Sequence, residues 1–77
     1  MPRAFILINV ETGEEDNVYR QVKAMGFVEE AYVSYGVYDL ITKVKADTMV
    51  ELKDEVTKKI RQIKQVRSSL TLIMMDE

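Results

Sequence analysis

Cysteine and histidine are absent from this 77-residue chain, which also has one proline and three glycines. Without cysteine, the chain can form neither a disulfide nor a Cys-x-x-Cys redox or zinc site. Asp and Glu side chains remain for a metal ion and suit calcium or magnesium, but no calcium-loop pattern occurs. Nucleophilic catalysis by Ser or Thr lacks its usual histidine partner. We therefore expect no cofactor and no catalytic residues.

Long apolar runs and an excess of basic residues are missing as well. The first residues do not form a signal peptide, and no apolar run approaches the roughly 18 residues of a membrane span. Net charge is −2, from 11 basic and 13 acidic residues, whereas nucleic-acid-binding proteins usually have a basic face. We expect a cytoplasmic protein that contacts neither a membrane nor DNA or RNA directly.

The length predicts a single domain over residues 1–77. A chain of this size buries only about 60% of its unfolded surface, so it would be marginally stable as a monomer.

Four strands are predicted from β-favouring residues and apolar runs. They cover residues 4–10, 28–35, 38–46 and 66–75.

Two helices are predicted from apolar spacing and capping patterns. Thr12 and Glu15 have the spacing of a capping box, which predicts a first helix over residues 14–25. Thr48 and Glu51 repeat that spacing before a second helix. Its apolar stripe consists of Leu52, Val56, Ile60 and Ile63.

The predicted element order is β-α-β-β-α-β, a duplicated split βαβ unit. With right-handed crossovers, this order gives a ferredoxin-like fold: a four-stranded antiparallel sheet with two helices on one face. The fold class is therefore α+β.

Both faces of the first and last strands are apolar. In the first strand Ile6 and Ile8 point one way, while Phe5 and Leu7 point the other. The last strand likewise places Leu70, Leu72 and Met74 opposite Ile73 and Met75. Because helices can cover one face alone, we expect the other face to pack on the sheet of a second copy, giving a dimeric α+β barrel. A monomer with over-long apolar strands is the alternative.

A glycine turn with a nearby carboxylate joins the second and third strands. Gly36 can adopt positive φ without steric cost, so we expect the chain to reverse there. Asp39 is placed one residue into the third strand, where Asp is uncommon. Such a carboxylate either ties down its own turn or faces a ligand.

Residue types near this turn suit a small zwitterion. Asp39 could accept from an ammonium group, and backbone N–H groups around Gly36 could bind a carboxylate. Further candidates are the hydroxyls of Ser68, Ser69 and Thr71, with Tyr38 and Met49 as an apolar wall. Each also has a structural interpretation: Asp39 can stabilise its turn, and the serines can simply begin a strand.

Residues 36–41 (GVYDLI) and 66–73 (VRSSLTLI) resemble the effector-binding (RAM) domain of the Lrp/AsnC regulators. The resemblance extends over essentially the whole chain. It implies an amino-acid-sensing module whose sheets pair and whose dimers form larger assemblies, with the amino acid bound between dimers. Nothing resembling the family's helix-turn-helix precedes Met1, which implies a stand-alone form that could co-assemble with a full-length regulator.

The resemblance also implies an effector-binding site. By matching position, it consists of Gly36, Tyr38, Asp39, Met49, Ser69, Thr71 and Ile73, shared between subunits. Ser68 matches a position that varies in type and is left out.

Three other functions remain as alternatives. An ACT-like regulatory domain shares this strand order and would bind its ligand near Thr12 and Gly13. A small α/β-barrel enzyme is disfavoured by the missing histidine, and a purely structural assembly domain is the third alternative. An RNA-recognition module has the same order, but its aromatic third-strand motif is absent here.

Overall fold

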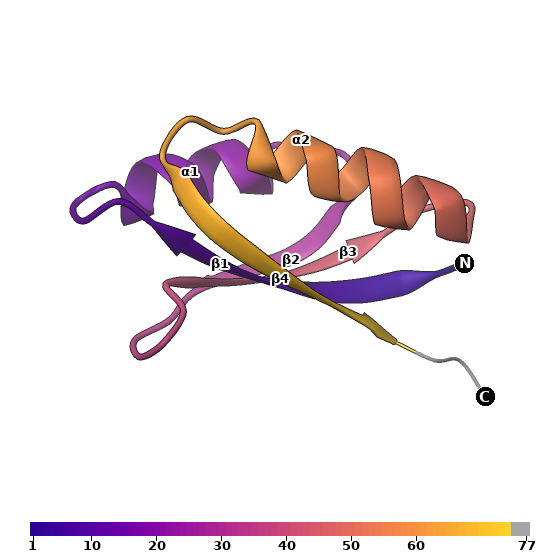
Figure 1. Ribbon diagram of the computed structural model, residues 1–77, viewed down its shortest axis with the longest axis horizontal. Coiled ribbons are helices and arrows are strands. Elements are labelled where there is room, and N and C mark those ends of the chain that lie inside the picture. The colour runs from indigo at the N-terminus through magenta and orange to yellow at the C-terminus, as the bar shows by residue number, and fades with distance from the viewer. Residues whose placement is uncertain (75–77) are drawn as a thin grey trace.

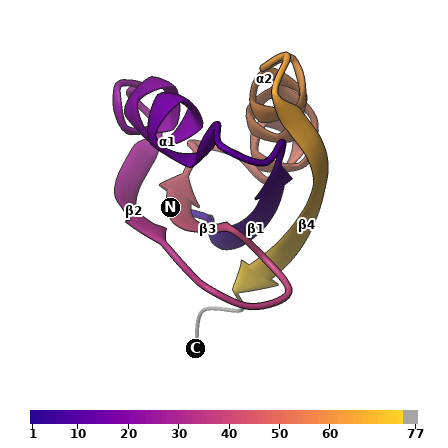
Figure 2. The same cartoon turned by 90° about the vertical axis from the view of Figure 1, so that its left-hand side faces the viewer.

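The computed structural model describes residues 1–74. Its elements in chain order are β1 (Arg3–Val10), α1 (Glu15–Lys23), β2 (Val28–Val33), β3 (Leu40–Lys45), the π-helical turn η1 (Glu51–Val56), α2 (Thr57–Arg61) and β4 (Val66–Met74). Within these residues, the strands form one antiparallel sheet in the order β2-β3-β1-β4. Both helices lie on one face of this curved sheet (Figure 1, Figure 2). The predicted ferredoxin-like fold is confirmed.

The core lies between the sheet and the helices. Ile6 and Ile8 of β1 are fully buried, as are Val18 and Val22 of α1. The second helical segment contributes the predicted stripe, Leu52, Val56, Ile60 and Ile63, all of it buried. Burying one such side chain stabilises the fold by roughly 1.5–3 kcal/mol. The helical periodicity therefore identified the buried side of the second helix correctly.

The two predicted capping boxes have different outcomes. Thr48 Oγ1 accepts a hydrogen bond from the Glu51 N–H at 3.1 Å, as expected. At the first helix the prediction is wrong, because Glu14 occupies the N-cap position and makes no side-chain cap bond. Gly13, at φ +87°, turns the chain just before the helix, so Thr12 lies in that turn rather than at the N-cap.

The connection between β2 and β3 is longer than predicted. β2 ends at Val33 and β3 begins at Leu40, so six residues, 34–39, form the loop. Gly36 has the expected positive φ, +137°. The Ser34 N–H closes the loop by donating to the Asp39 carbonyl at 2.8 Å. Asp39 therefore lies in the loop and not inside the third strand, contrary to the prediction.

The sheet face away from the helices is apolar at its centre. Leu7 pairs with Leu70 and with Ile41, and Phe5 pairs with Leu72. Leu70 and Leu72 are 44% and 48% exposed. These five side chains are called the open face below. None of the described helices covers them (Figure 1).

The outward position of Leu70 and Leu72 confirms the predicted alternation in the last strand. Ile73 pairs with the buried Ala4 and belongs to the helix side. Met75 lies outside the described residues. No helix within residues 1–74 is long and apolar enough to cross a membrane.

Candidate functional site

Asp39 fastens the β2–β3 loop to the end of β1. Its backbone N–H donates to the Ile8 carbonyl at 2.9 Å, and its carboxylate Oδ2 accepts from the Val10 N–H, also at 2.9 Å. The carboxylate of Asp39 therefore has a structural role, but it ties the loop to β1 and makes no hydrogen bond within its own turn, residues 34–39. It leaves room for a ligand, because an ionised carboxylate has about four acceptor positions and the described residues use one.

A β-bulge lies where the end of β1 pairs with β4, between Asn9 and Val10. In the β1–β4 ladder Asn9 pairs with Ser68 and Val10 pairs with Val66, so Arg67 has no partner residue in β1. A bulge of this kind changes the direction of a side chain and often occurs beside a functional site. Asp39 from the loop and Arg67 from β4 thus approach the same end of β1.

The two charged side chains line one hollow of about 390 Å³. Its lining consists of Asn9, Val10, Asp39, Arg67 and Ser68. Asn9 Nδ2 donates to Ser68 Oγ at 3.1 Å, which ties the two strands together at the hollow. A carboxylate and a guanidinium on one hollow match the ammonium and the carboxylate of an amino acid. We call this the Asp39 hollow.

Neither charge is neutralised within the described part of the chain. The ion pairs there join Arg3 to Glu29 and Lys43 to Glu30, both away from the hollow. Arg67 is exposed. The guanidinium of Arg67 and the remaining acceptor positions of the Asp39 carboxylate are therefore available for a ligand.

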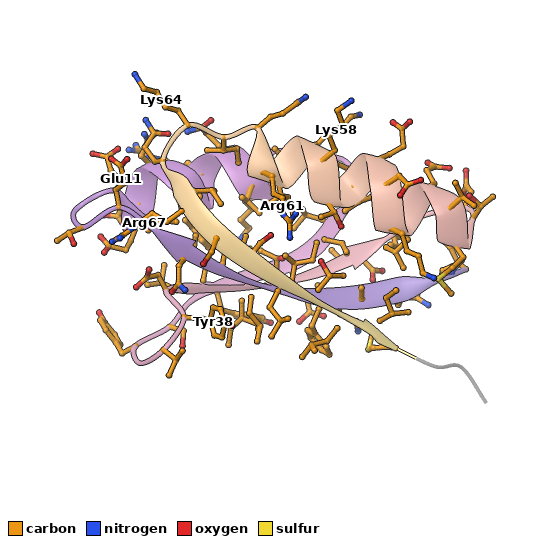
Figure 3. The ribbon with its side chains drawn as sticks, in the orientation of Figure 1. Glu11, Tyr38, Lys58, Arg61, Lys64 and Arg67 are labelled. Atoms are coloured by element: carbon orange, nitrogen blue, oxygen red, sulfur yellow. The ribbon has the colours of Figure 1, made fainter. Side chains whose placement is uncertain are left out.

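Other predicted site residues lie near this end of the sheet. Gly36 and Tyr38 belong to the same loop as Asp39, and Tyr38 lies at its base on the side away from the helices (Figure 3). Ser69 pairs with Ile8, the residue whose carbonyl Asp39 binds. One chain therefore brings the loop residues close to the beginning of β4.

The remaining predicted residues lie farther along. Ile73 pairs with Ala4, four residues from Ile8, or about 13 Å along a strand. Met49 follows β3, whose last residue, Lys45, pairs with Arg3 at that same far end. Thr71 lies between, with its hydroxyl 3.4 Å from that of Thr57. A single chain does not gather Met49 and Ile73 beside Asp39.

Three lining residues, Asn9, Val10 and Arg67, were not predicted from the sequence, and Ser68 was considered and then left out. Arg67 had no distinguishing signal, because a basic residue at the start of a strand is ordinary. Its importance comes from the bulge and from the Asp39 loop, which lies 28 residues earlier in the chain.

A second hollow, of about 380 Å³, lies on the other side of the loop. It is lined by Gly13, Glu15, Asp16, Val33, Ser34, Tyr35, Gly36 and Asp39. An ACT-like domain would bind its ligand here. The lining has three carboxylates and no basic side chain, so the carboxylate of an amino acid would lack a charged partner.

The pKa shifts of the described residues occur away from both hollows. The Arg3 guanidinium, bonded to Glu29, holds the pKa of that carboxyl below its ordinary value. A hydrogen bond to Tyr19 raises the pKa of Lys23, and one to Glu30 raises the pKa of Tyr32. No group of acidic side chains in residues 1–74 is arranged to hold a metal ion.

Comparison with known proteins gives a family and several similar structures. The model of the Lrp/AsnC ligand binding domain matches residues 3–77. The crystal structure of FFRP-DM1 is 43% identical, with a TM-score of 0.92 over 97% of this chain and 100% of that one. Hypothetical protein PHS023 from Pyrococcus horikoshii is also 43% identical, with a TM-score of 0.90 over 100% and 93%.

Escherichia coli AsnC is a more distant similar structure. It is 25% identical, with a TM-score of 0.88 over 99% of this chain and 52% of AsnC. The present chain thus spans about half of that regulator. No protein with a curated description matches the chain.

Proposed function

Because the chain belongs to the Lrp/AsnC ligand-binding domain family, we propose that it is a non-catalytic regulatory module that binds an amino acid between subunits of a homo-oligomer. The observation that carries this proposal is the Asp39 hollow. Its lining includes a carboxylate and a guanidinium that forms no ion pair within residues 1–74, and these are the two charges that a zwitterion requires.

The amino acid would bind in a defined orientation. Its ammonium donates to the carboxylate of Asp39, and its carboxylate accepts from the guanidinium of Arg67. Both are charge-assisted hydrogen bonds, which are about twice as strong as neutral ones. The carboxylate is held in place before the ligand arrives by the Val10 N–H, which donates to Oδ2, and by the main-chain hydrogen bonds that join Asp39 to Ile8 and Ser34. Holding it in place reduces the entropy lost on binding.

A second copy is proposed to cover the open face. Phe5, Leu7, Ile41, Leu70 and Leu72 form an apolar surface that the helices of the same chain leave uncovered. Sheet-on-sheet packing would bury this surface on both copies through one twofold interface. The resulting particle is the dimeric barrel expected from the sequence.

Contacts between dimers would complete the binding site. The β2–β3 loop presents Tyr35 and Val37, which are 97% and 81% exposed, and these side chains suit a contact with another subunit. Met49 and Ile73, too far from Asp39 in one chain, could then come from a neighbour together with Thr71. The proposed site thus comprises Gly36, Tyr38, Asp39, Arg67 and Ser69 from one subunit. Met49, Thr71 and Ile73 would come from the next.

Binding at a subunit boundary would connect the ligand to the assembly. A ligand that prefers one oligomer shifts the equilibrium by its difference in affinity for the two states. The module would act in the cytoplasm without contacting DNA, by assembling with itself or with a full-length regulator of the same family.

Calorimetric titration with the twenty amino acids tests this function. The wild-type chain should bind at least one of them, and Asp39→Asn should weaken that binding at least tenfold. Asparagine keeps an oxygen for the Val10 N–H and removes the charge. Asp47→Asn, a carboxylate lost outside the hollow, is the matched control and should bind normally. Absence of binding at millimolar concentration, or equal binding by Asp39→Asn, would contradict the proposal.

Two further measurements address the assembly and the location of the site. Light scattering should give a mass of at least twice the 8.9 kDa of one chain; a monomer at micromolar concentration would remove the proposed interface. Hydrogen exchange should show ligand protection at residues 8–10 and 34–39. Protection of the Gly13 turn instead would favour the ACT-like alternative.

A further inference from the structure

A second guanidinium, that of Arg61, lies beside the Asp39 hollow. An adjoining hollow of about 330 Å³ is lined by Arg61, Val66, Arg67, Ser68 and Ser69. Arg67 and Ser68 line both hollows, so the two hollows adjoin at the beginning of β4. Together their linings include one carboxylate, that of Asp39, and two guanidinium groups, those of Arg67 and Arg61. We call the second part the Arg61 hollow.

Arg61 is held in place without being neutralised. Its Nε donates to Ser69 Oγ at 3.0 Å, and its Nη2 lies 3.5 Å from the Ser69 carbonyl oxygen. A guanidinium has five N–H donors, so three remain for a ligand. No carboxylate within residues 1–74 forms an ion pair with it.

The direction of Arg61 differs from that of its basic neighbours. Its side chain extends from α2 toward β4, whereas Lys58 and Lys64 point away from the sheet (Figure 3). The lysines have the orientation expected of a solvated helix end, where cations are favoured by the helix dipole. Arg61 instead points its guanidinium to the strand that carries Arg67.

We propose that the Arg61 hollow binds the side-chain carboxylate of the effector, so that the module recognises an acidic amino acid, aspartate or glutamate. This inference rests on the proposed function and names its ligand class. Asp39 binds the ammonium, Arg67 the α-carboxylate, and Arg61 with the Ser69 hydroxyl binds the second carboxylate. The planar fork of a guanidinium matches a carboxylate with two parallel hydrogen bonds.

Neutral amino acids of the same shape provide the comparison that tests this class. Glutamine and asparagine replace the second carboxylate with an amide, which lacks the charge that strengthens the bonds to Arg61. Hydrogen bonds to charged groups are worth about 1.5–3 kcal/mol. We therefore expect glutamate or aspartate to bind about tenfold to a hundredfold more tightly than its amide.

The experiment is calorimetry of the full chain with glutamate, aspartate, glutamine and asparagine, in three proteins. The wild type should prefer the acidic ligands. Arg61→Gln should lose that preference and bind the amides as the wild type does. Lys64→Gln, which removes the same charge from a side chain pointing away from β4, should keep the preference. Arg61 is exposed, so Arg61→Gln should also unfold at the wild-type temperature.

The outcomes separate this inference from the proposed function. Binding of neutral amino acids more tightly than acidic ones overturns the acidic class and leaves the amino-acid site intact. Absence of all amino-acid binding overturns both. Equal losses in Arg61→Gln and Lys64→Gln overturn the assignment to Arg61, because they indicate a long-range charge effect. Inorganic phosphate bound through Arg61, with no preference for acidic amino acids, also overturns it.

Discussion

In the described part of the chain, residues 1–74, the sheet contains two bulges, one at each end, and both place a charged residue outside the ladder. In β2, Val28 pairs with Val44 and Glu30 with Lys43, which leaves Glu29 unpaired. In β4 the corresponding residue is Arg67. Glu29 accepts a hydrogen bond from Arg3 Nε at 3.0 Å, whereas Arg67 has no ion-pair partner in residues 1–74 and lines two hollows.

The difference shows that the backbone irregularity alone does not mark a site. Both bulges redirect a charged side chain, but the carboxylate of Glu29 forms an ion pair with Arg3 of the same chain. Arg67 instead lines a hollow whose lining also includes the carboxylate of Asp39. The availability of the charge, more than the bulge, distinguishes the two ends.

The largest effect is expected from Asp39→Ala, which should largely remove amino-acid binding at the Arg67 end of the sheet. Alanine removes both the charge facing the ligand and the acceptor of the Val10 N–H. Amino-acid affinity should fall about a hundredfold. The free energy of unfolding should fall by about 1–3 kcal/mol, because a part-buried donor loses its partner. Calorimetry and urea unfolding measure the two losses. Unchanged stability would mean that the loop is not fastened through this carboxylate.

Removing the charged group at each bulge in turn tests whether the two bulges have different roles. Arg67→Gln should weaken amino-acid binding about tenfold or more with little change in stability, because its guanidinium has no partner within the described chain. Glu29→Gln should leave binding unchanged and slightly lower the unfolding midpoint, since it removes the charge that strengthens the hydrogen bond from Arg3. Calorimetry and thermal unfolding of both variants give the answer. The reverse pattern would remove the distinction between the two bulges.

A smaller effect is expected at Asn9, a neutral residue of the Asp39 hollow. Asn9→Ala removes the hydrogen bond to Ser68 Oγ and leaves both charges in place. Neutral hydrogen bonds contribute about 0.5–1.5 kcal/mol, so losing this connection between β1 and β4 should lower the affinity by no more than about tenfold in calorimetry. A loss as large as that of Arg67→Gln would show that charge does not dominate the site.

The smallest effect is the pH dependence of stability at the other bulge. The folded pKa of Glu29 lies below its ordinary value of 4.5 because Arg3 bonds the ionised form. The stabilisation is therefore complete above that ordinary value and is lost as the pH falls through the lower folded pKa. The difference in unfolding midpoint between wild type and Glu29→Gln should shrink on going from pH 7 toward pH 3. A difference that grows with acid would contradict the Arg3 bond.

The fold could be predicted from the sequence because periodic burial determines it. Leu52 and Ile60 recur at helical spacing, and Leu70 and Leu72 alternate with Ile73. These spacings predicted correctly which side of the helix is buried and which side of β4 faces away from the helices. Element ends were less predictable. Thr12 has the spacing of a capping residue, but the positive φ of Gly13 places it in a turn.

The site could be predicted in part. Asp39 was identified because a carboxylate beside a glycine turn requires an explanation. The positive φ of Gly36 was predicted correctly, but the loop is longer than predicted and includes Asp39. Arg67 could not be identified, because its role depends on a shift in register between Asn9 and Val10 and on a loop distant in sequence. The pairing or non-pairing of a charge is a property of the folded chain, and spacing does not encode it.

A crystal structure of the chain with its bound amino acid tests the central claim most directly. We expect the ligand's ammonium within hydrogen-bonding distance of Asp39 and its carboxylate on the guanidinium of Arg67, in an assembly whose open faces are packed together. A ligand held away from both side chains, or open faces left in solvent, would contradict the claim.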